Sequence, residues 1–363
     1  MPTYLQPDQL ARDLALRDLT DPDSGPHAMQ LLVDLAAGAL TAAFGCDQRL
    51  VAGSRIVPIA DNYDHLGFTA EAASRDARYT RYVDEHRMLR SHASAMVPPA
   101  LRALAADPAD NVLLVCPGVV FRRDAIDRLH TGTPHQLDLW RIARRRLGND
   151  DMDEMTRLLT EALVPDRAHR SEGRVHPYTL DGRQVDVAAG GEWVEVAECG
   201  LAHPEVLARA GLAGWHGLAL GLGLDRLLML RKGIPDIRLL RSTHPRIAEQ
   251  MLDLMPYRAV SSMPAITRDL SVAVDADDAV EELGDRVRDA LGARADAVEE
   301  VSVRSETPYA QLPSSAVSRM GMTPGQKNVL VRVVLRQLDR TLTDSEANDL
   351  RDRIYAALHR GGR

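Results

Sequence analysis

The segment from Gly217 to Arg226 holds the residues whose types and spacing most directly suggest chemistry. It reads Gly-Leu-Ala-Leu-Gly-Leu-Gly-Leu-Asp-Arg. Glycine has no Cβ, so the backbone of such a run can approach a ligand closely. The arginine that ends it can present a planar fork of donors to phosphate oxygens. The string alone is equally typical of glycine-rich packing between a strand and a helix, so a functional interpretation needs a partner segment.

A partner segment of charged and polar residues lies earlier in the chain. It runs Phe121-Arg122-Arg123-Asp124 and continues through His130 to His135-Gln136-Leu137-Asp138. Gln136 and Asp138 are two residues apart, which places both on one face of a strand, where they could accept hydrogen bonds from an ammonium group. Arg122 could neutralise the charge that develops when a carboxylate attacks a phosphate. These residue types could bind an ammonium group and a phosphate within one site.

The two segments together resemble motifs 2 and 3 of class II aminoacyl-tRNA synthetases, and most of all those of the phenylalanyl-tRNA synthetase catalytic subunit. Further segments resemble that family in the same order along the chain. They are residues 88–95 (Met-Leu-Arg-Ser-His-Ala-Ser-Ala), 193–196 (Trp-Val-Glu-Val), 199–207 (Cys-Gly-Leu-Ala-His-Pro-Glu-Val-Leu) and 233–238 (Gly-Ile-Pro-Asp-Ile-Arg). Several ordered matches are far more specific than any one of them, and the resemblance covers most of the chain.

This resemblance implies an enzyme that uses ATP and Mg²⁺ to form an aminoacyl-adenylate and transfers the amino acid to tRNA, a ligase whose substrate is phenylalanine or a divergent amino acid. Arg122 would hold the α-phosphate and Arg226 the γ-phosphate, and both are the candidate catalytic residues. The other implied ATP contacts are Asp124, His130 and Glu195, with Glu195 also a ligand of Mg²⁺. The implied amino-acid contacts are His92, Ser94, Gln136, Asp138, His176, Tyr178 and Ala219.

Departures from the family pattern concentrate in the amino-acid pocket. His176-Pro177-Tyr178 replaces a Phe-Pro-Phe segment whose two rings hold the substrate phenyl group, and buried polar groups require partners. A site built to hydrogen-bond its substrate can reject an analogue by roughly four to five powers of ten. Asp138 replaces the usual Glu, Pro134 replaces a Phe that stacks on adenine, and Glu198 replaces a Gly beside the adenylate. We therefore expect a side chain that is polar or differently shaped from phenylalanine.

Three hypotheses follow for the activity. The first is a single-chain synthetase that charges tRNA. The second is a paralogue that activates a non-standard amino acid for a biosynthetic pathway and hands it to a carrier or an amine. The third is a non-catalytic binder of tRNA. The presence of both Arg122 and Arg226 argues against the third hypothesis, and a C-terminal domain of the anticodon-binding type argues for tRNA over a carrier.

Composition is typical of a cytoplasmic enzyme. Of 363 residues, 45% are hydrophobic and 4% aromatic, so aliphatic side chains must build the cores. The net charge of −8 provides no overall attraction for nucleic acid, and a tRNA binder would need a local basic face. Three widely spaced cysteines show neither metal-ligand spacing nor a disulfide framework. We find no apolar run of membrane-spanning length and no secretory or transit signal, so we expect no membrane association.

The first 256 residues are expected to form an α+β catalytic domain, with residues 1–25 as a helical extension. By the resemblance, its sheet is antiparallel and flanked by helices. The periodicity of apolar residues over 27–44 predicts a long helix at the place of class II motif 1. In that family the element usually carries the dimer contact, but a plain core helix is equally compatible with the pattern, so both a monomer and a homodimer stay possible. The other expected elements are helices over 7–19 and 152–163, strands over 51–59 and 112–121, a strand pair over 185–196, and a strand-to-helix passage over 220–230.

Residues 257–363 are expected to form a separate ferredoxin-like βαββα domain. Strands are predicted over 266–274, 298–303 and 329–335, with helices over 277–291 and 341–358. Thr343 and Glu346 have the spacing of a capping box at the start of the last helix. The resemblance implies the anticodon-binding domain of single-chain, organellar-type enzymes. The charge distribution gives weak support for tRNA binding by this domain. Residues 304–363 hold ten basic and six acidic residues, whereas residues 275–300 hold three basic and ten acidic residues.

Overall fold

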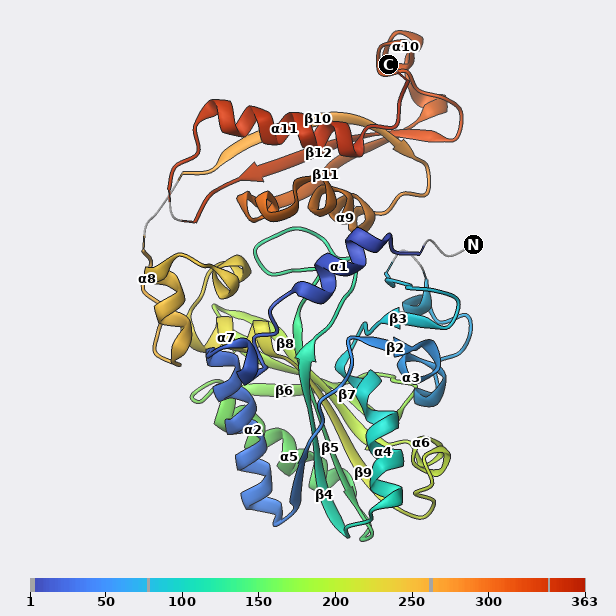
Figure 1. Cartoon of the computed structure of the whole chain (residues 1–363), viewed down its shortest axis with the longest axis vertical. Helices are drawn as coiled ribbons and strands as arrows, with labels where there is room; N and C mark the ends of the chain where they lie inside the picture. Colours follow the sequence, from blue (N-terminus) through green and yellow to red (C-terminus); the bar gives the residue numbers. More distant parts are fainter. Residues whose placement is uncertain (1–3, 77–78, 261–263, 339, 363) are drawn as a thin grey trace. The chain divides into compact units, whose positions relative to one another are not determined.

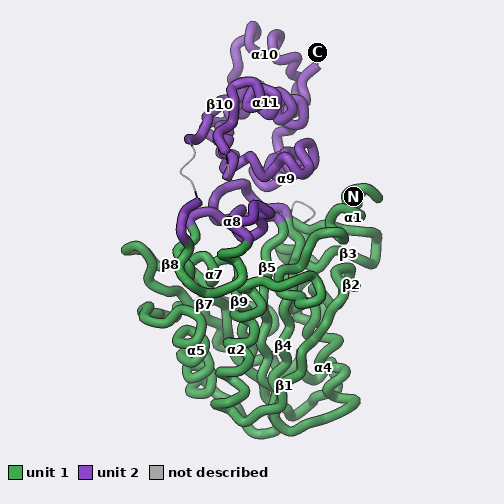
Figure 2. Tube along the Cα trace, turned by 60° about the vertical axis from the view of Figure 1, so that its left-hand side comes forward, with its two compact units in different colours: residues 1–122, 133–234, 249–257 green, residues 123–132, 235–248, 258–363 purple. Residues whose placement is uncertain are grey.

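The structure, a computed structural model, describes residues 4–76, 79–260, 264–338 and 340–362. The chain separates into two compact units, drawn in different colours in Figure 2. Unit 1 comprises residues 1–122, 133–234 and 249–257, and unit 2 comprises 123–132, 235–248 and 258–363. Each unit is described by itself below.

Unit 1 is built on a seven-stranded sheet with the order β1-β4-β5-β9-β8-β7-β6. Every neighbouring pair is antiparallel except β1 with β4, which is parallel, so the expected antiparallel sheet is confirmed with one parallel edge pair. The strands are β1 (Asp47–Leu50), β4 (Asn111–Val119), β5 (His135–Ala143), β6 (His169–Gly173), β7 (Thr179–Ala189), β8 (Glu192–Ala202) and β9 (His216–Gly223).

Helices cover both faces of this sheet (Figure 1). On one face lie α2 (Ala28–Phe44), α5 (Asn149–Leu163) and α7 (Leu224–Lys232), and on the other lies α4 (Val97–Ala106). Helix α2 buries residues at three- and four-residue spacing along its length and ends where Gly45 takes the left-handed conformation that terminates helices. The shorter helices of this unit are α1 (Pro7–Ala15), α3 (Ile59–Asn62) and α6 (Pro204–Arg209).

One expected strand is wrong. Residues 51–59 do not form a single strand: β1 ends at Leu50, and β2 (Ile56–Pro58) pairs instead with β3 (Arg87–Leu89) in a separate two-stranded sheet. Gly53 explains the break, because its backbone lies against Met96 and Arg90 with no room for a side chain, and Arg90 donates to its carbonyl oxygen (3.1 Å). The chain therefore changes direction where a β-rich composition suggested continuity.

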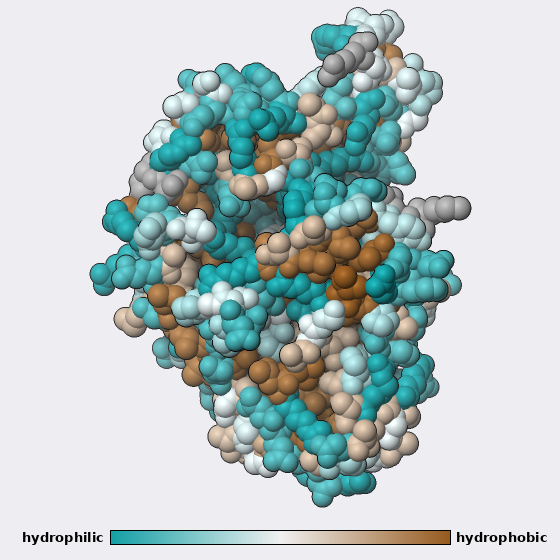
Figure 3. Space-filling model, viewed as in Figure 1, coloured by the Kyte–Doolittle hydropathy of each residue, from teal (hydrophilic) through white to brown (hydrophobic). Residues whose placement is uncertain are grey.

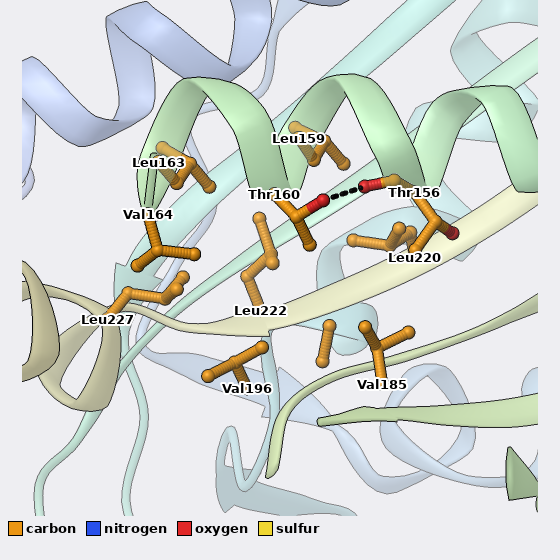
Figure 4. Close-up of a pocket in the computed structure, with 11 residues that line it drawn as sticks. Thr156, Leu159, Thr160, Leu163, Val164, Val185, Val196, Leu220, Leu222 and Leu227 are labelled. Carbon is orange, nitrogen blue, oxygen red and sulfur yellow. Dashed lines mark hydrogen bonds between the residues drawn. The ribbon is translucent and has the colours of Figure 1, made fainter. Parts of the chain in front are cut away.

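The face of the sheet beneath α5 contains a small apolar pocket (Figure 4). The Thr160 hydroxyl donates to the Thr156 carbonyl oxygen (3.0 Å) within the helix, and the Thr156 hydroxyl lies 3.9 Å from Cys199 Sγ, so both polar side chains have partners. The remaining lining is aliphatic apart from the backbone: Leu159, Leu163, Val164, Val185, Val196, Ala197, Leu220, Leu222 and Leu227. This pocket is core packing, and the residues predicted to do chemistry lie elsewhere.

Unit 2 contains a three-stranded antiparallel sheet with the order β10-β12-β11. Its elements are β10 (Ile266–Asp275), α9 (Val280–Leu291), β11 (Val298–Pro308), α10 (Ser314–Met320), β12 (Gln326–Leu335) and α11 (Asp344–Leu358), with α8 (Pro245–Ala248) before them. The expected βαββα order is confirmed, with the short α10 inserted between β11 and β12. Thr343 and Glu346 form the predicted capping box.

Two segments from earlier in the chain complete unit 2. Ile126 forms a β-bridge with Val301 and belongs to the same apolar core as the three strands. Glu299, which is 4% exposed, accepts hydrogen bonds from Arg128 (2.6 Å) and Arg336, and lies 3.4 Å from Arg238. Charge pairing and apolar packing thus hold residues 123–132 and 235–248 in this unit.

No helix within the described residues is both long and apolar enough to cross a membrane. On the face shown in Figure 3, hydrophobic residues gather in several patches separated by hydrophilic ones. Leu31 and Leu35 on α2 are each 39% exposed, so the helix expected at motif 1 keeps part of its apolar surface accessible within this chain.

Candidate active site

Three cross-strand rows on β5, β9 and β8 organise the candidate site. The deep row pairs Trp140 with Ala219 and Ala219 with Gly200. The middle row pairs Asp138 with Gly221 and Gly221 with Glu198, and the outer row pairs Gln136 with Gly223. Side chains two residues apart share a face of a sheet, so these rows lie side by side on the face that α4 covers.

The space above the strands increases from the deep row to the outer row. A Cβ added to Gly200 would lie 2.7 Å from the Thr179 side chain, so the deep row has no free space there. A Cβ on Gly221 would meet only the Asp138 carboxylate, at 3.2 Å. A Cβ on Gly223 would meet nothing within 4 Å. Crowding at the glycines therefore decreases from the deep row to the outer row, where Gly223 is open.

Asp138 places a buried carboxylate in the middle row. It is 4% exposed, and burial raises its pKa from 3.8 to about 6, with the charge of Glu198 adding to the rise and a hydrogen bond from Ser94 opposing it. Trp140 Nε1 lies beside this carboxylate without a well-angled hydrogen bond to it. A bound cation would relieve the unfavourable burial of this charge.

Three stacked rings form one wall. The Tyr178 ring stacks on Trp140 with centroids 6.0 Å apart, and the His176 ring stacks on Tyr178 at 5.7 Å. His176 Nε2 lies 3.3 Å from Glu198 Oε1, close enough for an ion pair, and this contact lowers the pKa of Glu198. Burial and the charges of Asp138 and Glu198 raise the pKa of Tyr178, so its phenol stays protonated. The predicted replacements for the two Phe residues do lie together.

The loop before α4 supplies His92 in a defined tautomer. The Ser91 backbone N–H donates to Asn62 Oδ1 (3.1 Å), which directs the Asn62 amide N–H₂ toward His92 Nε2 (3.3 Å). His92 Nε2 therefore accepts, and Nδ1 carries the proton. Nδ1 is buried and has no hydrogen-bond partner among the described residues. Burial and the charge of Arg122 lower the pKa of His92 to about 4, so this side chain is a neutral donor available to a ligand.

Gln136 is anchored to the same loop, because its Oε1 accepts a hydrogen bond from the Ala93 backbone N–H (3.0 Å). Ser94 is 5% exposed and hydrogen-bonds with Asp138 and Tyr178. The predicted amino-acid contacts in this loop and on β5 thus form one connected group.

The outer end of the rows carries the positive charge. Arg226, in the first turn of α7, donates to the Glu195 carbonyl oxygen (2.9 Å). Burial and the charge of Glu198 raise the pKa of the Glu195 carboxyl, whereas Arg226 lowers it. Arg122 acts electrostatically on both His92 and Glu198. Arg122 and Arg226 are therefore both connected to the residues of the rows.

A buried network that the sequence did not suggest fixes the start of β5 relative to α7. His135 Nε2 accepts from the Leu19 backbone N–H (3.1 Å), so Nδ1 carries the proton that faces Asp225 Oδ1 (3.3 Å). The His135 backbone N–H also donates to Asp225. Asp18 accepts from the Val119 backbone N–H (2.9 Å) at the end of β4. Contacts across 90 to 116 residues leave no local signal in a sequence.

Two predicted ATP contacts, Asp124 and His130, belong to unit 2. The Asp124 carbonyl oxygen accepts from Arg288 (2.7 Å), and His130 Nδ1 lies 2.7 Å from Asp127 Oδ2. Their proposed roles at ATP stay predictions. Among the described residues no cluster of three or more His, Cys, Asp or Glu side chains could hold a metal ion alone. Glu195 fits Mg²⁺ only in the usual manner, with substrate phosphates supplying further oxygens.

Residues 41–251 match the model of the tRNA synthetases class II core domain (F), and residues 261–361 match the ferredoxin-fold anticodon-binding domain. The first match spans more than half of the chain. This chain belongs to the class II tRNA synthetase family. The sequence resemblance and the fold class are confirmed. The three rows on β5, β9 and β8 all lie within the matched core region.

The relatives of this synthetase include both single-chain and multi-subunit enzymes. It is 27% identical to a probable mitochondrial phenylalanine–tRNA ligase of Drosophila melanogaster, over 83% of this chain and 75% of that protein. It is 28% identical to the chloroplastic/mitochondrial phenylalanine–tRNA ligase of Arabidopsis thaliana, over 83% and 68%. It is 33% identical to the phenylalanine–tRNA ligase alpha subunit of Prochlorococcus marinus (strain MIT 9313), over 57% and 61%.

Proposed function

We propose that this protein activates an amino acid with ATP and transfers it to tRNA. The observation that carries the proposal is the arrangement of the rows. A buried carboxylate at Asp138 is positioned for an ammonium group, the open glycine Gly223 lies in the next row on β9, and Arg226 follows Gly223 at the start of α7. The names of the organellar relatives support the same chemistry.

Each side chain would then have a distinct role. Asp138 and Gln136 would hold the α-ammonium, and His92 Nδ1–H would donate to the substrate carboxyl group. Arg122 would neutralise charge at the α-phosphate as the carboxylate attacks, and Arg226 would hold the far end of the triphosphate. Positioning both reactants in one site also removes much of the entropic cost of their encounter.

ATP and Mg²⁺ are the cofactors we propose. The open backbone at Gly223 and the Arg226 guanidinium would receive the triphosphate, and Glu195 would give an oxygen ligand to Mg²⁺. The metal would supply additional positive charge on the phosphate oxygens.

Transfer to tRNA is proposed from unit 2. Residues 261–361 match the ferredoxin-fold anticodon-binding domain. The second hypothesis, delivery of a non-standard amino acid to a carrier or amine, is favoured only by the altered pocket around His176 and Glu198.

Amino-acid-dependent exchange of pyrophosphate into ATP, followed by charging of total tRNA with the amino acids that support exchange, tests this proposal. We expect exchange with at least one amino acid and an aminoacyl-tRNA product. Exchange without any charging would support the carrier hypothesis and contradict the tRNA role. A panel of standard and non-standard amino acids that supports no exchange would contradict activation itself.

A further inference from the structure

We infer that the deep row is closed to substrate, so that the site accepts an amino acid with a short side chain and excludes aromatic ones. This inference rests on the proposed function and names its substrate class. It comes from Trp140, a residue for which the sequence suggested no role.

Trp140 fills the space beside Ala219 in the deep row. Without the indole, the small side chain of Ala219 would leave that space open to a substrate side chain. The two residues are paired in register, Trp140 is 0% exposed, and Ala219 is 2% exposed. Both belong to one apolar core, against which Tyr178 packs. The predicted role of Ala219, to bound the far end of a substrate ring, would require that space to be empty.

Neighbouring side chains close the rest of the deep row. The Tyr178 ring covers Trp140, and Phe68 lies 6.2 Å from Tyr178 and 5.7 Å from His92 between ring centroids. On the β8 side, Thr179 occupies the position above Gly200. Along β9, Gly221 is therefore the first position of the rows at which an added Cβ would meet no side chain except the Asp138 carboxylate.

The spacing of the rows sets the permitted length. Adjacent rows are two residues apart, or about 6.8 Å at about 3.4 Å per residue. An amino acid whose ammonium group lies against Asp138 and whose carboxyl group points to Arg226 must extend its side chain toward Trp140. A phenylalanine side chain spans about that whole row spacing and would overlap the indole, whereas the side chains of alanine and serine would not.

The experiment measures the kcat/KM of pyrophosphate exchange with alanine, serine, leucine and phenylalanine. The wild-type chain is compared with Trp140→Leu, which opens the deep row, and with the conservative Trp140→Phe. Trp215→Leu is the matched control, because Trp215 is also buried in this core yet stacks under Arg144 (4.5 Å) away from the rows.

We expect the wild type to use alanine or serine at least 10-fold better than phenylalanine, since even one methylene is worth about 10–200-fold in a shaped pocket. Trp140→Leu should shift the ratio toward phenylalanine by at least 10-fold, and Trp215→Leu should leave the ratio unchanged. If Trp140→Leu does not fold, two measurements on the wild type still test the inference. They are the ratio of kcat/KM for alanine or serine to that for phenylalanine, and the rise in melting temperature that each of these amino acids causes.

Efficient use of phenylalanine by the wild type would overturn this inference alone and leave amino-acid activation intact. An equal shift in both tryptophan variants would also overturn it. Absence of exchange with every amino acid would instead contradict the proposed function, so the two failures are distinguishable.

Discussion

At the scale of single residues, the site holds a carboxylate charge that burial disfavours. Asp138 is buried on β5, and its pKa is raised to about 6 mainly by that burial. Glu198 keeps its charge through His176, and its pKa is lowered. At neutral pH the folded chain therefore carries a buried, charged carboxylate that lowers its stability. Functional sites commonly lose stability in this way in favour of binding.

Asp138→Asn should stabilise the ligand-free protein at pH 7.5 and abolish amino-acid binding. Because the folded pKa lies above the ordinary 3.8, the folded state holds the proton more tightly, and stability falls as pH rises from about 4 to about 6. The difference corresponds to up to roughly 3 kcal/mol at about 1.4 kcal/mol per pKa unit. Urea unfolding of both proteins at pH 4 and pH 7.5 measures it. A wild type as stable as the variant at pH 7.5 would contradict this prediction.

The face of the sheet on which a side chain lies could be predicted from the sequence only where side chains alternate regularly along a strand. Gln136 and Asp138 were placed on one face from their spacing of two, and the structure agrees. Glu195 and Glu198 are three apart and would face opposite ways in a regular strand. A bulge between the pairs Val185–Ala197 and Asp186–Glu195 resets the alternation. The influence of Glu198 on Glu195 could therefore not be foreseen.

At the scale of elements, most helices and strands follow from local pattern. The capping box of α11 and the periodicity of α2 were visible in the sequence, whereas the break after β1 depended on tertiary contacts of Gly53. The addition of Ile126 to the core of unit 2 depends on a long-range bridge to Val301. Contacts between residues far apart in the chain produce no periodic pattern in the sequence.

Glu299→Gln should destabilise unit 2, because Arg128, Arg238 and Arg336 would lose their shared buried anion. Loss of one partner of a buried ion pair costs roughly 3–5 kcal/mol, and we expect the lower end since Arg128 remains half exposed. Glu306→Gln is the matched control on the same strand, because Glu306 is 44% exposed and pairs only with Lys327 (3.0 Å) among the ion pairs described. Denaturant unfolding that gives equal losses for both variants would refute the role of Glu299.

Gly38→Ala should stabilise α2 by roughly 0.5–1 kcal/mol. Gly38 lies within the helix, an added Cβ would meet nothing within 4 Å, and glycine costs about that much relative to alanine in a helix interior. Thermal unfolding at neutral pH checks the gain. A lower melting temperature would contradict this prediction.

At the scale of the whole molecule, the overall charge opposes the partner that we propose. The chain carries a net charge of −8, yet unit 2 matches an anticodon-binding domain. If the chain binds tRNA as we propose, the contacts would have to come from local groups of basic side chains, such as those of residues 304–363. The boundary near residue 256 and the independence of residues 257–363 stay predictions.

Binding of tRNA by the full chain should weaken steeply with salt. Each phosphate contact releases counterions and adds about 0.7–0.9 to the negative slope of log K against log salt concentration. Filter binding between roughly 50 and 200 mM KCl measures this slope. Binding that is absent, or that does not change with salt, would argue for a carrier or amine as the acceptor.

The central claim is that Arg122 and Arg226 activate an amino acid at the three rows. Amino-acid-dependent pyrophosphate exchange by the wild type, Arg226→Ala and Arg157→Ala tests it most directly, since Arg157 lies on the surface of α5 and pairs with Glu154 and Glu161. We predict robust exchange by the wild type and by Arg157→Ala, and a loss of about 10²–10³-fold in Arg226→Ala, as for removal of a charge-stabilising donor. Exchange by Arg226→Ala at the wild-type rate would contradict the account.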